Sequence, residues 1–365
     1  MRLFIVTSVY QFLNALTVQL NNPDEKGDLL CVCDLLENTF DLEKLHTYGL
    51  FENVYSWTGE INRFMMSSTN KGAHFKNTLK KVGLALNNKK LTKNLPRPQK
   101  EYDEICVGYP DYPTRLAAQT LRSKNTKFSL LEEGTYTYEF LAQKQSFLKK
   151  TAFKFFIGAD IVEDSEKVYV YRPEILQQGD KQRETIKILP ELEKLGEIIR
   201  LTYKQEIPAV ETIDKPFIMF DETMEDEVVN ANQNRIALSL VKCVGADNCV
   251  VKMHPKYTFS PYDEDIPLYT AKCPFEILMS AINIEKKALV SILSTACINP
   301  KMMLDAEPYI IFTVKISGVE QSALHNPEML KIIDRVKSLY RNPERIFVPE
   351  TFEEFEQIVN FLQEN

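Results

Sequence analysis

The sequence predicts an α/β protein built from two Rossmann-like domains that face a cleft. The chain of 365 residues is too long for one average hydrophobic core, so two domains are expected. Short apolar runs typical of buried strands alternate with helix-like segments in two separate blocks of the chain. Polar residues collect where these strands end, which is where open α/β sheets bind their ligands.

The first block contains several predicted strands. These are Leu3–Val6, Leu29–Cys33, Asn53–Trp57, Glu104–Val107, Lys127–Leu131 and Lys167–Tyr171. The stretch that follows, 176–216, is interrupted by Gly179, Pro190, Gly196 and Pro208, which favours a crossover between domains in this region. We therefore expect an N-terminal domain over 1–180 and a C-terminal domain over 181–345.

The second block repeats the pattern of strands and helices. Its predicted strands are Phe217–Phe220, Cys249–Val251, Ala288–Leu293, Tyr309–Val314 and a short one at Arg345–Pro349. Thr351 and Glu354 have the spacing of a capping box, which predicts that a helix begins there. We expect this C-terminal helix within 346–365.

Composition excludes several classes of protein. A net charge of −7 argues against general nucleic-acid binding, which requires a basic surface. The seven cysteines form no CxxC pair, which favours buried free thiols in a reducing compartment. The sequence shows no signal-peptide pattern and no run of about 18 apolar residues. We therefore expect a cytoplasmic protein without a transmembrane helix.

One segment departs from the acidic average. Between Lys76 and Lys100 there are seven lysines and one arginine, and no acidic residue. A solvated basic helix followed by a Pro-rich loop explains this pattern. The alternative is a patch that contacts anionic lipid on the inner face of the membrane, or an anionic acceptor.

Two polar groups follow predicted strands of the first block. Thr7, Ser8 and Gln11 lie between a strand and a helix, where hydroxyl and backbone N–H groups can receive an anion or a sugar. A plain helix N-cap explains the same residues. Glu132 and Glu133 are adjacent carboxylates at a strand end, and like charges raise one another's pKa toward the range useful for a general base. An acidic loop is the alternative interpretation.

The strand ending at Val251 carries the strongest signal in the second block. Lys252, His254, Pro255 and Lys256 follow it, and Pro255 cannot donate to a sheet, so the strand should stop there. An imidazole between two ammonium groups at a strand end suits an anion, above all a phosphate. A surface turn with ordinary lysines is the alternative.

Several sequence motifs are absent, and their absence disfavours particular classes of enzyme. The chain has no GxGxxG and no Walker motif, which disfavours dinucleotide oxidoreductases and P-loop ATPases. It also lacks a DxD after a strand, the pattern that holds a metal-bound sugar nucleotide. The sequence therefore favours chemistry without a metal or other cofactor.

Four motifs, in order along the chain, resemble those of bacterial sialyltransferases. They are the acidic-acidic-glycine motif at Glu132–Thr135, a His-Pro motif at Lys252–Pro255, a Pro-x-Glu element at Pro274–Glu276 and a Ser-Ser/Thr motif at Ser294–Thr295. The segments 7–15 and 169–174 also resemble the family-52 glycosyltransferases, which include lipooligosaccharide and capsular sialyltransferases. Each motif is weak alone, but the set spans almost the whole chain.

The resemblance implies a GT-B fold and an inverting, metal-independent transfer of sialic acid from CMP-sialic acid to a galactoside hydroxyl. It implies that His254 acts as the acid on the CMP phosphate, with Lys252 and Pro255 beside it. Ser294 and Thr295 would hydrogen-bond the same phosphate, and Glu276 would accept from the ribose hydroxyls. Thr7, Ser8 and Gln11 would hold the sialic acid or the floor of the cleft. A homodimer is a further expectation from the resemblance.

The general base stays open at this point. The acidic-glycine motif assigns it to Glu133 or Glu132, and we favour Glu133. An acidic residue after the first strand of the second domain is the alternative, and Asp226 is the next candidate among Asp221, Glu225 and Asp226. Two other functions also remain: transfer of another nucleotide-activated sugar, and nucleotide-sugar binding without catalysis.

Overall fold

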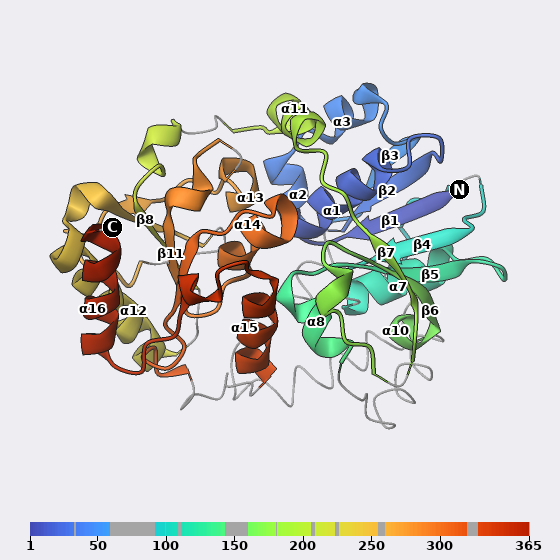
Figure 1. Cartoon of the computed structure of the whole chain (residues 1–365). Coiled ribbons are helices and arrows are strands. Elements are labelled where there is room, and N and C mark those ends of the chain that lie inside the picture. Colours follow the sequence, from blue (N-terminus) through green and yellow to red (C-terminus); the bar gives the residue numbers. More distant parts are fainter. Residues whose placement is uncertain are drawn as a thin grey trace. The chain divides into compact units, whose positions relative to one another are not determined.

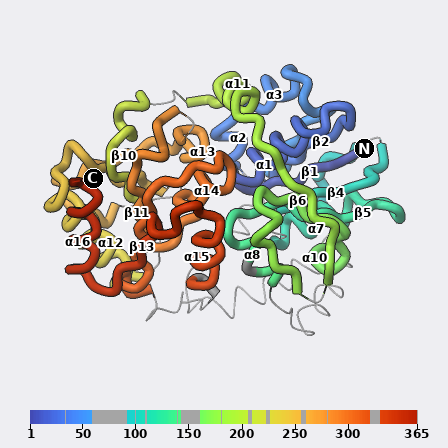
Figure 2. The backbone as a smooth tube through the Cα atoms, in the orientation of Figure 1, coloured from blue at the N-terminus to red at the C-terminus, as the bar shows by residue number. Residues whose placement is uncertain are grey.

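The computed structural model describes residues 1–32, 34–58, 92–98, 100–108, 111–142, 160–179, 181–205, 209–222, 226–254, 260–279, 281–319 and 328–364. The chain divides into two compact units, Met1–Glu206 and Ile207–Asn365. Each unit is one continuous stretch of chain, coloured from blue to green and then from yellow-green to red (Figure 2). Each contains a parallel sheet with helices, so the expectation of two α/β domains is confirmed (Figure 1).

The first unit contains a seven-stranded sheet in which every pair of neighbouring strands is parallel. Its strands, in the spatial order β3-β2-β1-β4-β5-β6-β7, are Asn53–Ser56, Gly27–Cys31, Arg2–Val6, Glu104–Val107, Lys127–Leu131, Ser165–Val170 and Glu184–Lys187. Its helices among the described residues are α1 (Val9–Leu20), α2 (Asp34–Thr39), α3 (Leu42–Tyr48), α7 (Tyr112–Leu121), α8 (Thr135–Phe140), α10 (Ile161–Asp164) and α11 (Leu192–Thr202).

The second unit contains a six-stranded parallel sheet. Its strands, in the spatial order β10-β9-β8-β11-β12-β13, are Leu268–Tyr269, Cys249–Lys252, Phe217–Phe220, Ala288–Ser291, Tyr309–Phe312 and Ile346–Phe347. Its described helices are α12 (Glu227–Val244), α13 (Phe275–Leu278), α14 (Thr295–Leu304), α15 (Glu328–Leu339) and α16 (Phe352–Glu364).

Both sheets have a point at which the strand order changes direction. In the first sheet this point lies between β1 and β4, and in the second it lies between β8 and β11. Ligands of open α/β sheets bind outside the carboxyl ends of the strands at such points. The fold therefore directs attention to the residues that follow these four strands.

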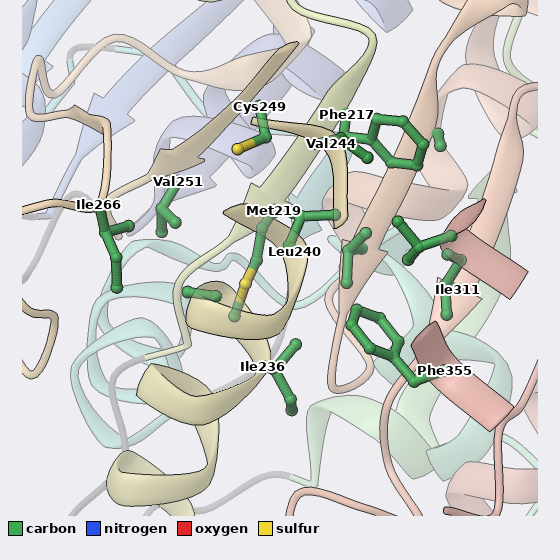
Figure 3. Packing of buried hydrophobic residues seen from close by; sticks show 14 of the residues in the cluster. Phe217, Met219, Ile236, Leu240, Val244, Cys249, Val251, Ile266, Ile311 and Phe355 are labelled. Atoms are coloured by element: carbon green, nitrogen blue, oxygen red, sulfur yellow. The ribbon is translucent and has the colours of Figure 1, made fainter. Parts of the chain in front are cut away.

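The core of the second unit lies between its sheet and two helices. Met219 on β8, Val251 on β9, Leu240 on α12 and Phe355 on α16 belong to one buried apolar cluster (Figure 3). Helix α12 also packs along α16. The C-terminal segment, expected as a separate helix over 346–365, therefore contributes both β13 and α16 to the second unit.

The boundary between the units lies later than the expected 180/181. Strand β7 pairs with β6, and α11 packs against α1 and α3, so residues up to Glu206 belong to the first unit. Glu184–Lys187 is a short, charged edge strand with no fully buried residue, so it lacks the apolar run that marks the other strands.

The structure bears only in part on two further expectations, which concern transmembrane helices and the basic segment between Lys76 and Lys100. No helix among the described residues is long and apolar enough to cross a membrane. The basic segment between Lys76 and Lys100 lies largely outside the described residues. Contact with a membrane therefore stays a prediction.

Candidate functional site

The turn after β1 is tied to the first helix. The Ser8 hydroxyl accepts from the backbone N–H of Gln11 at 3.2 Å and caps α1, as the N-cap interpretation predicted. Thr7 donates to Gln11 Oε1 through its backbone N–H at 2.8 Å and its hydroxyl at 3.1 Å. A Cβ on Gly108, which follows β4, would lie 2.5 Å from the Gln11 side chain. Because residue 108 is a glycine, the Gln11 side chain can lie against it, beside the point between β1 and β4 at which the strand order changes direction.

Glu132 is fully buried and supports the structure of the first unit. Its carboxylate accepts from the hydroxyls of Tyr10 at 2.8 Å and Tyr138 at 2.6 Å, and from the backbone N–H of Tyr171 at 2.8 Å. Burial raises the pKa of Glu132 to about 7, although these hydrogen bonds oppose the shift. A carboxylate with 0% exposure cannot reach an acceptor hydroxyl in this structure, which argues against Glu132 as the base.

Glu133 is half-buried and lies beside the turn after β1. Gln11 Nε2 donates to Glu133 Oε2, and the Ser8 hydroxyl approaches Glu133 Oε1 at 3.4 Å. Because Gln11 Oε1 already accepts from Thr7, its amide N–H must face the carboxylate. Gly134 has φ 57° and ψ −145°, a conformation that favours glycine, and it redirects the chain into α8. The structure therefore brings together Thr7, Ser8, Gln11 and Glu133.

Asp221 holds the end of β9 in the second unit. Its carboxylate accepts from the backbone N–H of His254 at 3.1 Å and from the hydroxyl of Tyr262 at 2.9 Å. This contact fixes the backbone of His254 at the strand end, as the sequence predicted. Pro255, Lys256 and Glu225 lie outside the described residues.

Lys252, the last residue of β9, is a buried cation. The residue is 4% exposed, and burial lowers the pKa of its ammonium group. The ammonium lies 5.8 Å from the centre of the Tyr269 ring on β10, but it makes no ion pair or hydrogen bond with any residue that the structure describes. The nearby charge of Glu276 favours its protonated form. Burial outweighs the favourable charges of Glu276 and Asp221, so a further anion beside Lys252 would stabilise its ammonium group.

Glu276 lies on α13, within range of the charge of Lys252. Its Oε1 accepts from Asn299 Nδ2 at 2.6 Å. Burial raises the pKa of Glu276, whereas the charge of Lys252 and the bond from Asn299 lower it. Asn299 lies one turn after Thr295, on the same helix α14. Sequence reasoning missed Asn299, because its partner Glu276 lies 23 positions away in the chain.

Ser294 and Thr295 begin α14, next to the switch point of the second sheet. The Ser294 hydroxyl accepts from the backbone N–H of Ala296 at 3.3 Å and caps the helix, while its own N–H donates to the Ser291 hydroxyl at 3.0 Å. Both motif residues are half-buried. Their location at a helix N-terminus is compatible with anion binding.

Glu222 is a second residue that the sequence interpretation missed. It follows Asp221 directly, and its Oε1 accepts from the backbone N–H of Leu293 at 2.9 Å, across the switch point between β8 and β11. Burial raises the pKa of Glu222 to about 7. Asp221 and Glu222 are adjacent acids after a strand, as Glu132 and Glu133 are. This pattern in the sequence could have marked Glu222 as a candidate.

Asp226, the second candidate for the base, is a helix cap. Its Oδ1 accepts from the backbone N–H groups of Val228 at 3.0 Å and Val229 at 3.2 Å, at the start of α12. This capping role accounts for the residue and weakens its case as the base. Among the described residues, no His, Cys, Asp and Glu side chains group as ligands for a metal ion. Metal independence stays a prediction.

Comparisons with known proteins support the fold. No protein-family model matches the sequence, and no curated protein matches it. The structure is similar to a putative UDP-N-acetylglucosamine 2-epimerase from Listeria monocytogenes, with a TM-score of 0.52 and 10% identity over 100% of this chain and 88% of that one. It is also similar to Arabidopsis thaliana UGT89C1 complexed with UDP, with a TM-score of 0.50 and 9% identity over 99% and 98%. At these identities the likeness shows the fold alone, and it confirms the GT-B-type architecture of two parallel-sheet domains.

Proposed function

We propose that this protein is a nucleotide-sugar-dependent glycosyltransferase that moves sialic acid from CMP-sialic acid to a galactoside hydroxyl. The acceptor would be a surface glycan such as a lipooligosaccharide or capsule. The observation that carries the proposal is the buried ammonium of Lys252, which makes no ion pair with any described residue and lies at a strand end. The ordered motifs that resemble sialyltransferases supply the identity of the sugar.

The second unit would bind the donor. A phosphate near Lys252 offsets the charge of the ammonium, and the N-terminus of α14 with Ser294 and Thr295 adds donors for the same group. Glu276, within range of the Lys252 charge, provides carboxylate oxygens for a ribose diol. Together these residues supply a cation, hydroxyl donors and an acceptor, which are the groups that a nucleoside monophosphate requires.

The first unit would supply the base. Glu133 is half-buried, and its neighbours Gln11 and Ser8 are side-chain donors. A rotamer change suffices to release a carboxylate held in this way. By contrast, Glu132 would have to leave three donors and a buried site.

The proposed transfer is a single displacement. Glu133 takes the proton of the acceptor hydroxyl, and the acceptor oxygen forms a bond to the anomeric carbon of sialic acid. The bond from that carbon to the phosphate oxygen breaks on the opposite side, and CMP leaves with the electron pair. The His254 imidazolium donates a proton to the departing phosphate, while Lys252 stabilises its charge. Attack opposite the leaving group inverts the anomeric configuration.

A donor comparison tests the proposal. The full chain is incubated with lactose and either CMP-sialic acid or UDP-activated sugars, and release of CMP or UDP is measured. We expect CMP release that depends on lactose, and its loss by orders of magnitude in His254→Ala. Release of UDP alone would reassign the donor. No release from any donor, together with no thermal shift on adding CMP, would contradict the proposal.

A further inference from the structure

Asn299 is a buried residue whose amide nitrogen makes a hydrogen bond, while its amide oxygen makes none with the described residues. The residue is 1% exposed, and its Nδ2 donates to Glu276 Oε1 at 2.6 Å. Its Oδ1 is buried and has no hydrogen-bond partner among the residues that the structure describes. Buried side-chain oxygens in native proteins are nearly always paired, so this atom calls for a missing donor.

The orientation of the Asn299 amide is fixed by its neighbour. An ionised carboxylate only accepts hydrogen bonds, so the NH₂ group of Asn299 must face Glu276. A flipped amide would place Oδ1 against Glu276 Oε1 and lose the bond. Burial raises the pKa of Glu276, while the charge of Lys252 and the hydrogen bond from Asn299 favour its ionised form. The free atom of Asn299 is therefore an acceptor.

A second unpaired polar atom lies next to the same cation. Within the described part of the chain, the buried hydroxyl of Tyr269 has no partner, and the Tyr269 ring centre lies 5.8 Å from the Lys252 ammonium. Leaving such a buried group unpaired costs about 1–3 kcal/mol. The Tyr269 ring thus borders the Lys252 ammonium, and Asn299 borders Glu276, whose charge acts on Lys252. This combination is typical of a ligand site and is unusual for a packed core.

We propose that Asn299 reads the nucleoside of the donor while it positions Glu276. Its Oδ1 would accept a hydrogen bond from a donor group of the nucleoside, either the exocyclic amine of cytosine or a ribose hydroxyl. Uracil has a carbonyl oxygen where cytosine has the amine, so a site that reads the base would place two acceptors together and reject uridine. The inference rests on the proposed function, because it takes the ligand to be a nucleotide.

The test measures binding of CMP, UMP and 2′-deoxy-CMP by calorimetry. If the amine is read, the wild-type chain binds CMP at least about tenfold more tightly than UMP; if the hydroxyl is read, the preference is over 2′-deoxy-CMP. Asn299→Ala is expected to reduce that ratio to below about threefold. Asn283→Ala, a change at an exposed asparagine of the same unit, serves as the control and should keep the wild-type ratio.

The outcomes separate this inference from the proposed function. Equal binding of all three nucleotides by the wild-type chain overturns the role of Asn299 and leaves a nucleotide site intact. An unchanged ratio in Asn299→Ala, with the variant folded by circular dichroism, overturns it as well. If Asn299→Ala fails to fold, the same ratio is measured in Asn299→Ser, and an unchanged ratio in that variant overturns the inference. Failure of every nucleotide to bind would contradict the proposed function itself.

Discussion

Two pairs of adjacent acids follow strands, one pair in each unit. Glu132–Glu133 follows β5 in the first unit, and Asp221–Glu222 follows β8 in the second. In each pair the first acid is buried and ties neighbouring elements together, while the second is half-buried. The pairs differ in what holds the second acid: side-chain donors hold Glu133, and a backbone N–H holds Glu222.

This difference favours Glu133 as the candidate base and assigns a structural role to Glu222. Glu133 is contacted by the side chains of Gln11 and Ser8, and it remains the residue that we propose as the base. The N–H of Leu293 belongs to the turn between β11 and α14, and it cannot leave without moving that turn. Glu222 therefore joins the two strands of the switch point, although its pKa of about 7 would by itself make it a base candidate.

The largest expected effect on turnover is that of a substitution at Glu133. Glu133→Gln keeps the shape of the side chain but cannot accept a proton, so we expect turnover to fall by about 10²–10⁴-fold. The free energy of unfolding should change by less than about 1 kcal/mol, because the residue is half-buried. Steady-state kinetics and urea unfolding measure the two quantities. If Glu133→Gln stays active while Asp226→Asn does not, the base lies in the second unit.

The neighbouring acid should show the opposite behaviour. Glu132→Ala leaves two tyrosine hydroxyls and the N–H of Tyr171 without their acceptor, so we expect a loss of about 3 kcal/mol or more in the free energy of unfolding. Glu101→Ala, at an exposed position, is the matched control and should cost less than about 0.5 kcal/mol. Denaturant unfolding followed by circular dichroism tests this. A stable Glu132→Ala variant would remove the structural role assigned to the first acid.

Glu307 extends the comparison to an acid that is surrounded by cations. It is buried, and its Oε1 contacts Lys301 Nζ at 2.7 Å and accepts from the backbone N–H of Arg341 at 2.8 Å. Burial alone would raise the pKa of Glu307, but these groups outweigh it and lower the pKa from 4.5 to about 2. Because the pKa of Glu307 is lower in the folded than in the unfolded chain, its ionised form stabilises the fold at pH values above the unfolded pKa. This stabilisation is lost as the pH falls toward the folded pKa.

We therefore expect Glu307 to contribute roughly 3 kcal/mol that disappears between pH 4.5 and about 2. Glu307→Gln should flatten the acid limb of the stability curve, measured by thermal unfolding across that range. An acid limb identical to that of the wild-type chain would show that Glu307 does not titrate as described. By contrast, the raised pKa of Glu132 makes its charge unfavourable for folding as the pH rises toward 7.

Strands with apolar runs were predictable from the sequence, whereas two of the four edge strands were not. Phe217–Phe220 and Lys127–Leu131 were predicted with the bounds that β8 and β5 have, because buried parallel strands are continuous apolar runs. Strands β7 and β10 were missed, since edge strands are exposed and short. The missing β7 also explains why the domain boundary was placed too early.

The candidate site was predictable where strand ends carry polar residues. Lys252, His254, Glu133 and Ser294 all lie at such ends. Sequence alone could not separate Glu132 from Glu133, because burial and the tyrosine donors come from elements distant in the chain. It also could not find Asn299, whose partner Glu276 is 23 positions away.

The charge of Lys252 offers the most direct test of a donor site in the second unit. Lys252→Met keeps the length of the side chain and removes a buried cation without a described ion-pair partner. The account predicts that CMP binding measured by calorimetry weakens by about tenfold or more, and that the free energy of unfolding falls, because the buried Glu276 loses the nearby cation. Lys272→Met, at an exposed lysine of the same unit, should change neither. Unchanged CMP affinity in Lys252→Met, with wild-type affinity measured in parallel, would contradict the assignment of this cation to the donor phosphate.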